Sequence, residues 1–153
     1  MSISWTIERA AAVATTRLIV PTAGEGFTDL TPSLSALISE LGAGEGVLLL
    51  FLRHTSASLL IQENADPDVQ TDLLTALHRL APTDGGWVHR LEGPDDMPAH
   101  VKAMLTGVSL HVPVVAGALA LGTWQGIYLA EHRRRPHRRE LIVQFVGSLA
   151  QPG

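Results

Sequence analysis

The segment "SLHVPVVAGALALGTWQGIYLAEHRRRPHRRELIVQFVGS" (residues 109–148) decides the fold class, because it predicts strands in succession with no helix between them. Its apolar stretches, "SLHVPVV", "GALAL", "WQGIYLAEH" and "RRELIVQFVGS", are separated by Gly, Pro and a basic turn. Short strands joined in this way are typical of an antiparallel meander. We therefore expect an antiparallel sheet in this part of the chain.

Upstream of this segment, the sequence predicts helices mixed with further strands. Thr31 and Asp66 are capping residues followed by proline, which is typical of a helix start. The predicted helices cover residues 32–41, 66–82 and about 97–106, and the predicted strands cover residues 15–20, 47–52, 59–61 and 87–91. Because strands and helices do not alternate regularly, we predict an α+β fold in a single domain, residues 1–153.

The strand "VLLLFL" (47–52) shows no alternation of polar and apolar residues, which predicts a central strand covered on both faces. Across the chain, 46% of residues are hydrophobic and 17% are charged. This balance exceeds what the surface of a monomer explains and predicts a buried subunit interface. We expect an oligomer.

Composition also excludes several kinds of protein. The chain has no cysteine, so disulfides and thiolate metal sites are excluded, and histidines and carboxylates are the strong metal ligands that remain. A net charge of −4 argues against nucleic acid and anionic membrane as partners. The longest apolar run, 112–122, is shorter than a spanning helix, and the start "MSISWTIER" does not resemble a secretory signal. We expect a cytoplasmic protein with no membrane span.

Seven histidines stand out, and three of them lie where rings could converge. His54 ends the buried strand, His89 lies on a short predicted strand, and His100 lies in the first turn of the third predicted helix. Three imidazoles with an open fourth position form a catalytic zinc centre. A carboxylate could orient one of the rings through its second nitrogen, and the candidates are Glu92, Asp95 and Asp96. The spacing of the three histidines has little specificity, however, and a buried histidine bonded to the backbone, or a capping histidine, explains the same residues.

Other polar groups have a structural and a functional explanation. "ENADPD" (63–68) concentrates carboxylates, yet Asp66 is also a good helix cap. Trp124 offers a flat face for a ring or a plug for the core. Five arginines fall within 133–139, as a solvated turn or as a phosphate site. The residues alone leave these alternatives open.

Four segments, taken together, resemble the YjbQ-like family of small cytosolic proteins. They occur in the family's order and spacing between Gly46 and Gly147: "RHTSASLLIQENADPDV" (53–69), "EGPDDMPAHVKAMLTGVSL" (92–110), "LALGTWQGIYLAEH" (119–132) and "RRELIVQFVG" (138–147). The resemblance implies a trimeric α+β protein with a largely antiparallel sheet sandwich. It also implies a metal-capable histidine site and, in some members, a secondary thiamine-phosphate synthase activity.

The resemblance also implies roles for individual residues. The metal ligands would be His54, His89 and His100, with zinc as the expected ion. The catalytic residues would be Glu131, Asp66 and Lys102. The substrate-binding residues would be Thr55, Ser56, Glu63, Asn64, Thr123, Trp124, Gln125 and either Arg138 or Arg139, since the turn "RRRPHRR" lacks the glycine often found there.

Three functions are compatible with these residues. The first is condensation of a pyrimidinylmethyl diphosphate with a thiazole phosphate, which gives thiamine phosphate and pyrophosphate. The second is a metal-dependent hydrolase of a small phosphorylated or cyclic metabolite. The third is a trimer that holds a ligand without turnover.

Overall fold

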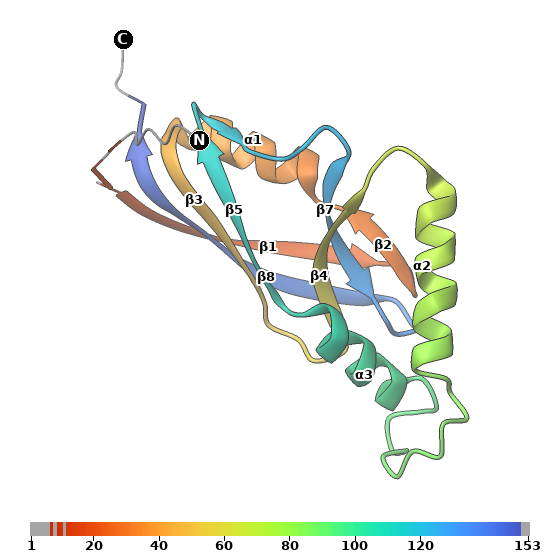
Figure 1. Cartoon of the computed structure of the whole chain (residues 1–153). Coiled ribbons are helices and arrows are strands. Elements are labelled where there is room, and N and C mark those ends of the chain that lie inside the picture. The colour runs from red at the N-terminus through yellow and green to blue at the C-terminus, as the bar shows by residue number, and fades with distance from the viewer. Residues whose placement is uncertain (1–6, 8, 11, 151–153) are drawn as a thin grey trace.

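The computed structural model describes residues 7, 9, 10 and 12–150 (Figure 1). Within them it has three helices, α1 (Thr31–Leu41), α2 (Pro67–Leu80) and α3 (Asp96–Thr106). The strands are β1 (Ala12–Thr22), β2 (Gly26–Asp29), β3 (Ala43–Leu52), β4 (Ala57–Glu63), β5 (Ser109–Val115), β6 (Ala118–Leu119), β7 (Gln125–Glu131) and β8 (His137–Leu149). None of the helices in these residues is long and apolar enough to cross a bilayer.

The strands form two antiparallel sheets, which confirms the predicted α+β class. One sheet has the order β1-β8-β3-β5-β6, and the other has the order β2-β7-β4. The predicted meander is wrong in one respect, because only β5 and β6 pair as consecutive strands. β7 instead enters the smaller sheet, and β8 runs between β1 and β3. Pairing between distant segments is set by the shared core, which local sequence patterns do not encode.

The core lies between the sheets and α1. Leu34 and Ile38 of α1 are buried against inward-facing residues of both sheets, among them Leu48, Leu50, Leu59, Ile127, Leu129, Leu141 and Phe145. The helix ends at Gly42, whose left-handed φ of 65° suits glycine. Thr31 does not cap α1 as predicted: Leu30 occupies the cap position, and the Thr31 hydroxyl accepts the backbone N–H of Ile127 at 2.9 Å.

β3 is central in its sheet, as predicted, but the chain covers only one of its faces. Leu48, Leu50 and Leu52 are buried in the core, whereas Phe51 on the other face is 52% exposed. The prediction of two covered faces is therefore wrong within one chain. An uncovered apolar face on a central strand is what a subunit interface would use.

The predicted strand at residues 87–91 is absent, and these residues lie in the loop between α2 and α3. Hydrogen bonds within the loop are present in place of bonds to a neighbouring strand. The Trp87 ring N–H donates to the Pro82 carbonyl at 2.7 Å, and Arg90 Nε donates to the Trp87 carbonyl at 2.7 Å. In Figure 1 this loop lies below α2 and α3. Alternation over five residues was too short a pattern to distinguish a strand from a loop of this kind.

Candidate metal centre

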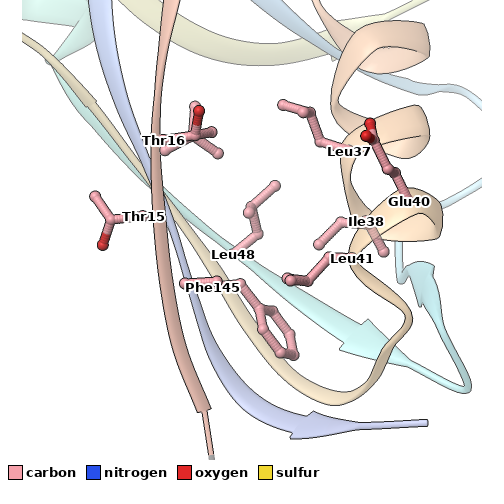
Figure 2. A pocket seen from close by; sticks show the side chains of 10 residues that line it. Thr15, Thr16, Leu37, Ile38, Glu40, Leu41, Leu48 and Phe145 are labelled. Carbon is pink, nitrogen blue, oxygen red and sulfur yellow. The ribbon is translucent and has the colours of Figure 1, made fainter.

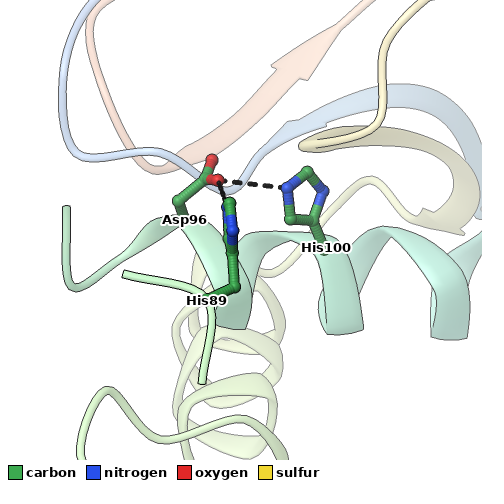
Figure 3. A group of neighbouring side chains, drawn as sticks. All are labelled: His89, Asp96 and His100. Atoms are coloured by element: carbon green, nitrogen blue, oxygen red, sulfur yellow. Dashed lines mark hydrogen bonds and ion pairs between the residues drawn. The ribbon is translucent and has the colours of Figure 1, made fainter. Parts of the chain in front are cut away.

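Three side chains from the 81–95 loop and from α3 converge on one point (Figure 3). The Nε2 atom of His89 lies 2.8 Å from Oδ2 of Asp96, and the Nε2 atom of His100 lies 3.1 Å from the same oxygen. One ligand atom from each residue lies within 4.8 Å of the other two. Asp96 and His100 share one face of α3 because four residues make about one helical turn.

The hydrogen bond of His100 Nδ1 determines whether His100 Nε2 carries a hydrogen or a lone pair. His100 Nδ1 lies 2.8 Å from the carbonyl oxygen of Thr55, which can only accept, so Nδ1 carries the hydrogen. In a neutral ring, Nε2 then presents a lone pair toward the Asp96 carboxylate. Two lone pairs that face each other repel unless a proton or a cation lies between them. A backbone carbonyl behind the ligating imidazole is the usual support of a metal site.

Asp96 is buried and ionised. Its other oxygen, Oδ1, receives a short contact from Nη1 of Arg133, whose side chain is also buried. Burial alone would raise the pKa of Asp96, but the hydrogen bond from His89 and the charge of Arg133 outweigh it and lower the pKa. Two imidazoles and one carboxylate form the ligand set of several catalytic zinc sites and of 2-His-1-carboxylate iron sites. These residues therefore fit a divalent transition metal.

His54 lies near this cluster but makes other contacts. Its Nε2 accepts the backbone N–H of Glu140 at 2.8 Å, and its Nδ1 lies 3.4 Å from Nη1 of Arg139. Burial, and then the charge of Arg139, lower the pKa of His54. The ring is thus kept neutral, with Nε2 already bonded. Its role as a metal ligand stays a prediction.

Glu131 and Arg139 form a buried ion pair behind His54. Arg139 donates from Nε to Glu131 Oε2 at 2.7 Å and from Nη2 to Oε1 at 2.5 Å. Glu131 also accepts the Thr22 hydroxyl at 2.8 Å, and Arg139 Nη2 donates to the Ser56 hydroxyl at 3.1 Å. Of the two candidate arginines, Arg139 is therefore the one that points inward.

Arg138, the other candidate, is exposed. It pairs in register with Pro21, near the end of β1 and the start of β8.

Lys102 lies on the other side of α3 from His100. Its ammonium makes a short contact with Glu25 Oε1, and Glu25 Oε2 lies 2.9 Å from Nε2 of His78. Lys102 is 3% exposed. The helix separates Lys102 from the metal cluster by more than 100° of turn, so the structure does not bring these residues together.

The remaining predicted residues gather at the far end of the smaller sheet. Ala57 pairs with Glu131 at one end of β4, and Glu63 pairs with Gln125 at the other end. Six residues of strand span roughly 20 Å. Asn64 bonds through its side chain to the Thr123 and Gln125 carbonyls, both at 3.4 Å.

Two further predicted residues belong to this distant group. Trp124 is 64% exposed. Asp66 accepts from the backbone N–H of Asp68 at 2.9 Å and caps α2. One chain thus carries two main groups of the predicted residues, and Lys102 lies outside both.

A cavity of about 720 Å³ opens beside the cluster. Apolar side chains such as Phe51 and Met104 supply much of its lining, and its polar wall consists of Arg53, His54, Thr55 and His100. A second cavity, of about 360 Å³, lies between α1 and the larger sheet (Figure 2). Its lining is aliphatic apart from Phe145, two threonines and Glu40, so it offers no group of metal ligands.

Two residues of the centre were not predicted in the roles that they have. Asp96 was expected at most to orient a ring, whereas its carboxylate lies among the ligand atoms, and Arg133 was not singled out. The spacing of Asp96 and His100 on a predicted helix was a usable signal for the first. No local signal pointed to Arg133, because its partners lie 37 and 38 residues away in the chain.

Comparison with known proteins agrees with this architecture. The family model described as "UPF0047 protein YjbQ-like" matches residues 16–148. The chain belongs to the YjbQ-like family. This YjbQ-like protein is 49% identical to the UPF0047 protein sll1880 of Synechocystis over 86% of its own length and 90% of the relative's.

Further relatives come from distant organisms. The chain is 44% identical to UPF0047 protein YjbQ of Salmonella typhimurium, over 80% of this chain and 89% of that protein. The crystal structure of the conserved hypothetical protein TT1486 from Thermus thermophilus superimposes with a TM-score of 0.76 at 42% identity, over 85% of this chain and 98% of that one. The hypothetical protein APE1520 from Aeropyrum pernix gives a TM-score of 0.81 at 29% identity, over 88% of this chain and 99% of that one.

Proposed function

We propose that this YjbQ-like protein is a zinc-dependent enzyme with thiamine-phosphate synthase activity. In the reaction, the bond between the pyrimidinylmethyl carbon and the diphosphate oxygen breaks. A bond between the same carbon and the thiazole nitrogen forms, and pyrophosphate leaves with the electron pair. The protein has to bind the anionic leaving group, align two rings and exclude water.

The observation that carries the metal assignment is the orientation of His100. Its Nδ1–H donates to the Thr55 carbonyl, so its Nε2 lone pair faces the Asp96 carboxylate and the His89 ring. His89, Asp96 and His100 would hold the ion. A divalent ion there would supply positive charge for a phosphate leaving group.

The cavity beside the centre supports a ligand with an apolar ring and an anionic tail. Phe51 and Met104 offer an apolar wall for a ring. His54 and Thr55 offer polar groups close to His100. A neutral His54 can donate or accept a hydrogen bond without adding charge. Arg139 raises the positive potential behind His54, although Glu131 compensates most of its charge.

We also propose that the protein is a homotrimer. The support is the outer face of the larger sheet, where Val13, Ile19 and Val115 are 68%, 40% and 52% exposed. An exposed apolar face of this kind is typical of an interface between subunits. Size-exclusion chromatography with light scattering would give three times the chain mass of 16.4 kDa; a monomer at micromolar concentration would contradict this proposal.

A two-substrate assay tests the enzymatic proposal. Purified protein, with its metal content measured by elemental analysis, is incubated with pyrimidinylmethyl diphosphate, with and without thiazole phosphate, and products are followed by mass spectrometry. Thiamine phosphate formed only with both substrates supports the proposal. Phosphate released without the thiazole indicates the hydrolase. No turnover, with a retained small molecule, indicates a binding protein and overturns the enzymatic assignment.

A further inference from the structure

We propose that Arg133 is the positioning residue that assembles the metal centre, by fastening the loop that carries His89 to the helix that carries Asp96 and His100. The inference rests on the metal site proposed above. It assigns a role to an arginine outside the ligand set.

The guanidinium of Arg133 bonds to both of the segments that supply ligands. Its Nη2 donates to the carbonyl oxygen of Glu92, in the 81–95 loop, at 2.7 Å. Its Nε donates to Oδ2 of Asp95 at 3.1 Å, and its Nη1 donates to Oδ1 of Asp96. Arg133 is 5% exposed, so water does not compete for these bonds. One rigid fork thus spans the loop and the start of α3.

The backbone of Arg133 is itself fixed. Its N–H donates to Glu131 Oε1 at 3.0 Å, and Glu131 is held by the buried pair with Arg139. Arg133 therefore projects from the end of β7 as part of a continuous network. The network connects the ion pair of Glu131 and Arg139 to the metal cluster through Arg133.

Apart from the bonds that the loop makes within itself at Trp87 and Arg90, the stretch around His89 has little other support. Val88 and Leu91, on either side of it, are 96% and 97% exposed, so apolar packing does not hold this stretch in place. The His89 side chain is 41% exposed and bonds to Asp96. Without the bond from Arg133 to Glu92, the position of His89 would depend on its contact with Asp96 and on the bonds that the loop makes within itself.

Arg133 also limits how Asp96 can bind an ion. Because Nη1 occupies Oδ1, the carboxylate presents Oδ2 alone to the two imidazoles. A lysine could replace the charge at this position but not the three separate bonds, since its ammonium is a point charge on a flexible stem. The geometry therefore predicts that Arg133→Lys is only a partial substitute.

Cobalt binding tests the inference, because Co²⁺ reports its ligands through its visible spectrum. Affinity is measured by competition with a chromophoric chelator for the wild type, Arg133→Met, Arg133→Lys and His89→Ala. Arg135→Met, an exposed neighbour in the same turn, is the matched control. We expect Arg133→Met to weaken Co²⁺ binding about 10- to 100-fold, the usual effect of losing an outer-shell partner. The Co²⁺ affinity of Arg133→Lys should lie between those of the wild type and Arg133→Met. The affinity of Arg135→Met should match that of the wild type.

Two readouts separate positioning from general destabilisation. The Co²⁺ spectrum of Arg133→Met should match that of His89→Ala, and adding Arg133→Met to His89→Ala should change affinity much less than it does in the wild type. Hydrogen exchange of loop 81–95 should accelerate in Arg133→Met while that of β3 and β8 is unchanged. If Arg133→Met does not fold, Arg133→Lys carries the same tests.

The outcomes discriminate between the two proposals. Wild-type affinity and spectrum in Arg133→Met and Arg133→Lys would overturn this inference alone. Equal losses in the wild-type and His89→Ala backgrounds would also overturn it, because Arg133 would then not act through the loop. A wild-type protein that binds no Co²⁺ would overturn the proposed function together with the inference.

Discussion

The Nδ1 atom of His100 lies 2.8 Å from the carbonyl oxygen of Thr55, so a backbone group 45 residues away sets the tautomer of a ring on α3. The sequence "RHTSASLLIQENADPD" (53–68) contributes to the centre through this carbonyl. Its polar side chains divide between the cavity, the buried ion pair and the cap of α2. The polar residues that follow β3 thus have several separate roles and do not form a single site.

His100→Ala should abolish tight metal binding, because it removes one of three ligands. His54→Ala is the informative comparison: the His54 Nε2 is already bonded to the Glu140 N–H, so we expect metal affinity within about threefold of the wild type, a loss of less than 1 kcal/mol. Chelator competition and elemental analysis measure both. Equal losses of metal in the two variants would show that His54 is a ligand.

Lys102→Met should lower stability rather than metal affinity. The substitution leaves Glu25 without its main partner, which costs about 2 to 4 kcal/mol, below the full cost for a buried charge because Glu25 is 18% exposed. Urea denaturation measures this loss, and Glu25→Gln in the same chain should restore part of it. A loss of turnover in Lys102→Met at full metal occupancy and normal stability would instead support the predicted catalytic role of Lys102.

Acid should destabilise the fold through His132. Burial, and then the charge of Lys102, lower the pKa of His132 from 6.5 to about 4. Between these values the unfolded chain binds a proton that the folded chain does not, so stability decreases as the pH falls from 6.5 toward 4. When the pH has fallen to about 4, this shift in pKa has lowered the free energy of unfolding by about 3 kcal/mol.

His132→Gln is the control for this effect, since an amide can still bond to Ser58, which lies 2.8 Å from His132 Nε2. Its unfolding free energy, measured by urea titration at several pH values, should vary less over that interval. Below pH 4.5, Glu131 and Glu25 add to the loss in both proteins. Burial alone would raise their pKa values, but their hydrogen bonds lower them, so their stabilisation disappears as they become protonated. An identical slope in the variant would contradict the assignment to His132.

Asp66→Ala should reduce stability by about 1 kcal/mol through loss of the helix cap. Asp66→Asn should retain most of this stability, because an amide oxygen can also accept a hydrogen bond at the cap of α2. Thermal unfolding of the two variants measures the difference. The predicted catalytic role would be supported if Asp66→Asn kept its stability and lost turnover.

The sequence by itself determined the α+β class and the three helices. Periodicity and capping residues are local signals, and Asp66, Pro67 and Gly42 mark helix ends wherever the helix packs. The sequence also indicated His89 and His100 as candidate metal ligands. The short pattern at 87–91 gave the wrong element, because a loop held by its own turn bonds can imitate strand alternation.

Only the tertiary structure decided the pairing of β8 between β1 and β3, and the separation of the predicted site residues into two groups about 20 Å apart. It also decided that Asp96 joins the two imidazoles and that Arg133 bonds to it. The physical reason is that buried charges need partners at hydrogen-bond distance, and the fold brings those partners from distant parts of the chain.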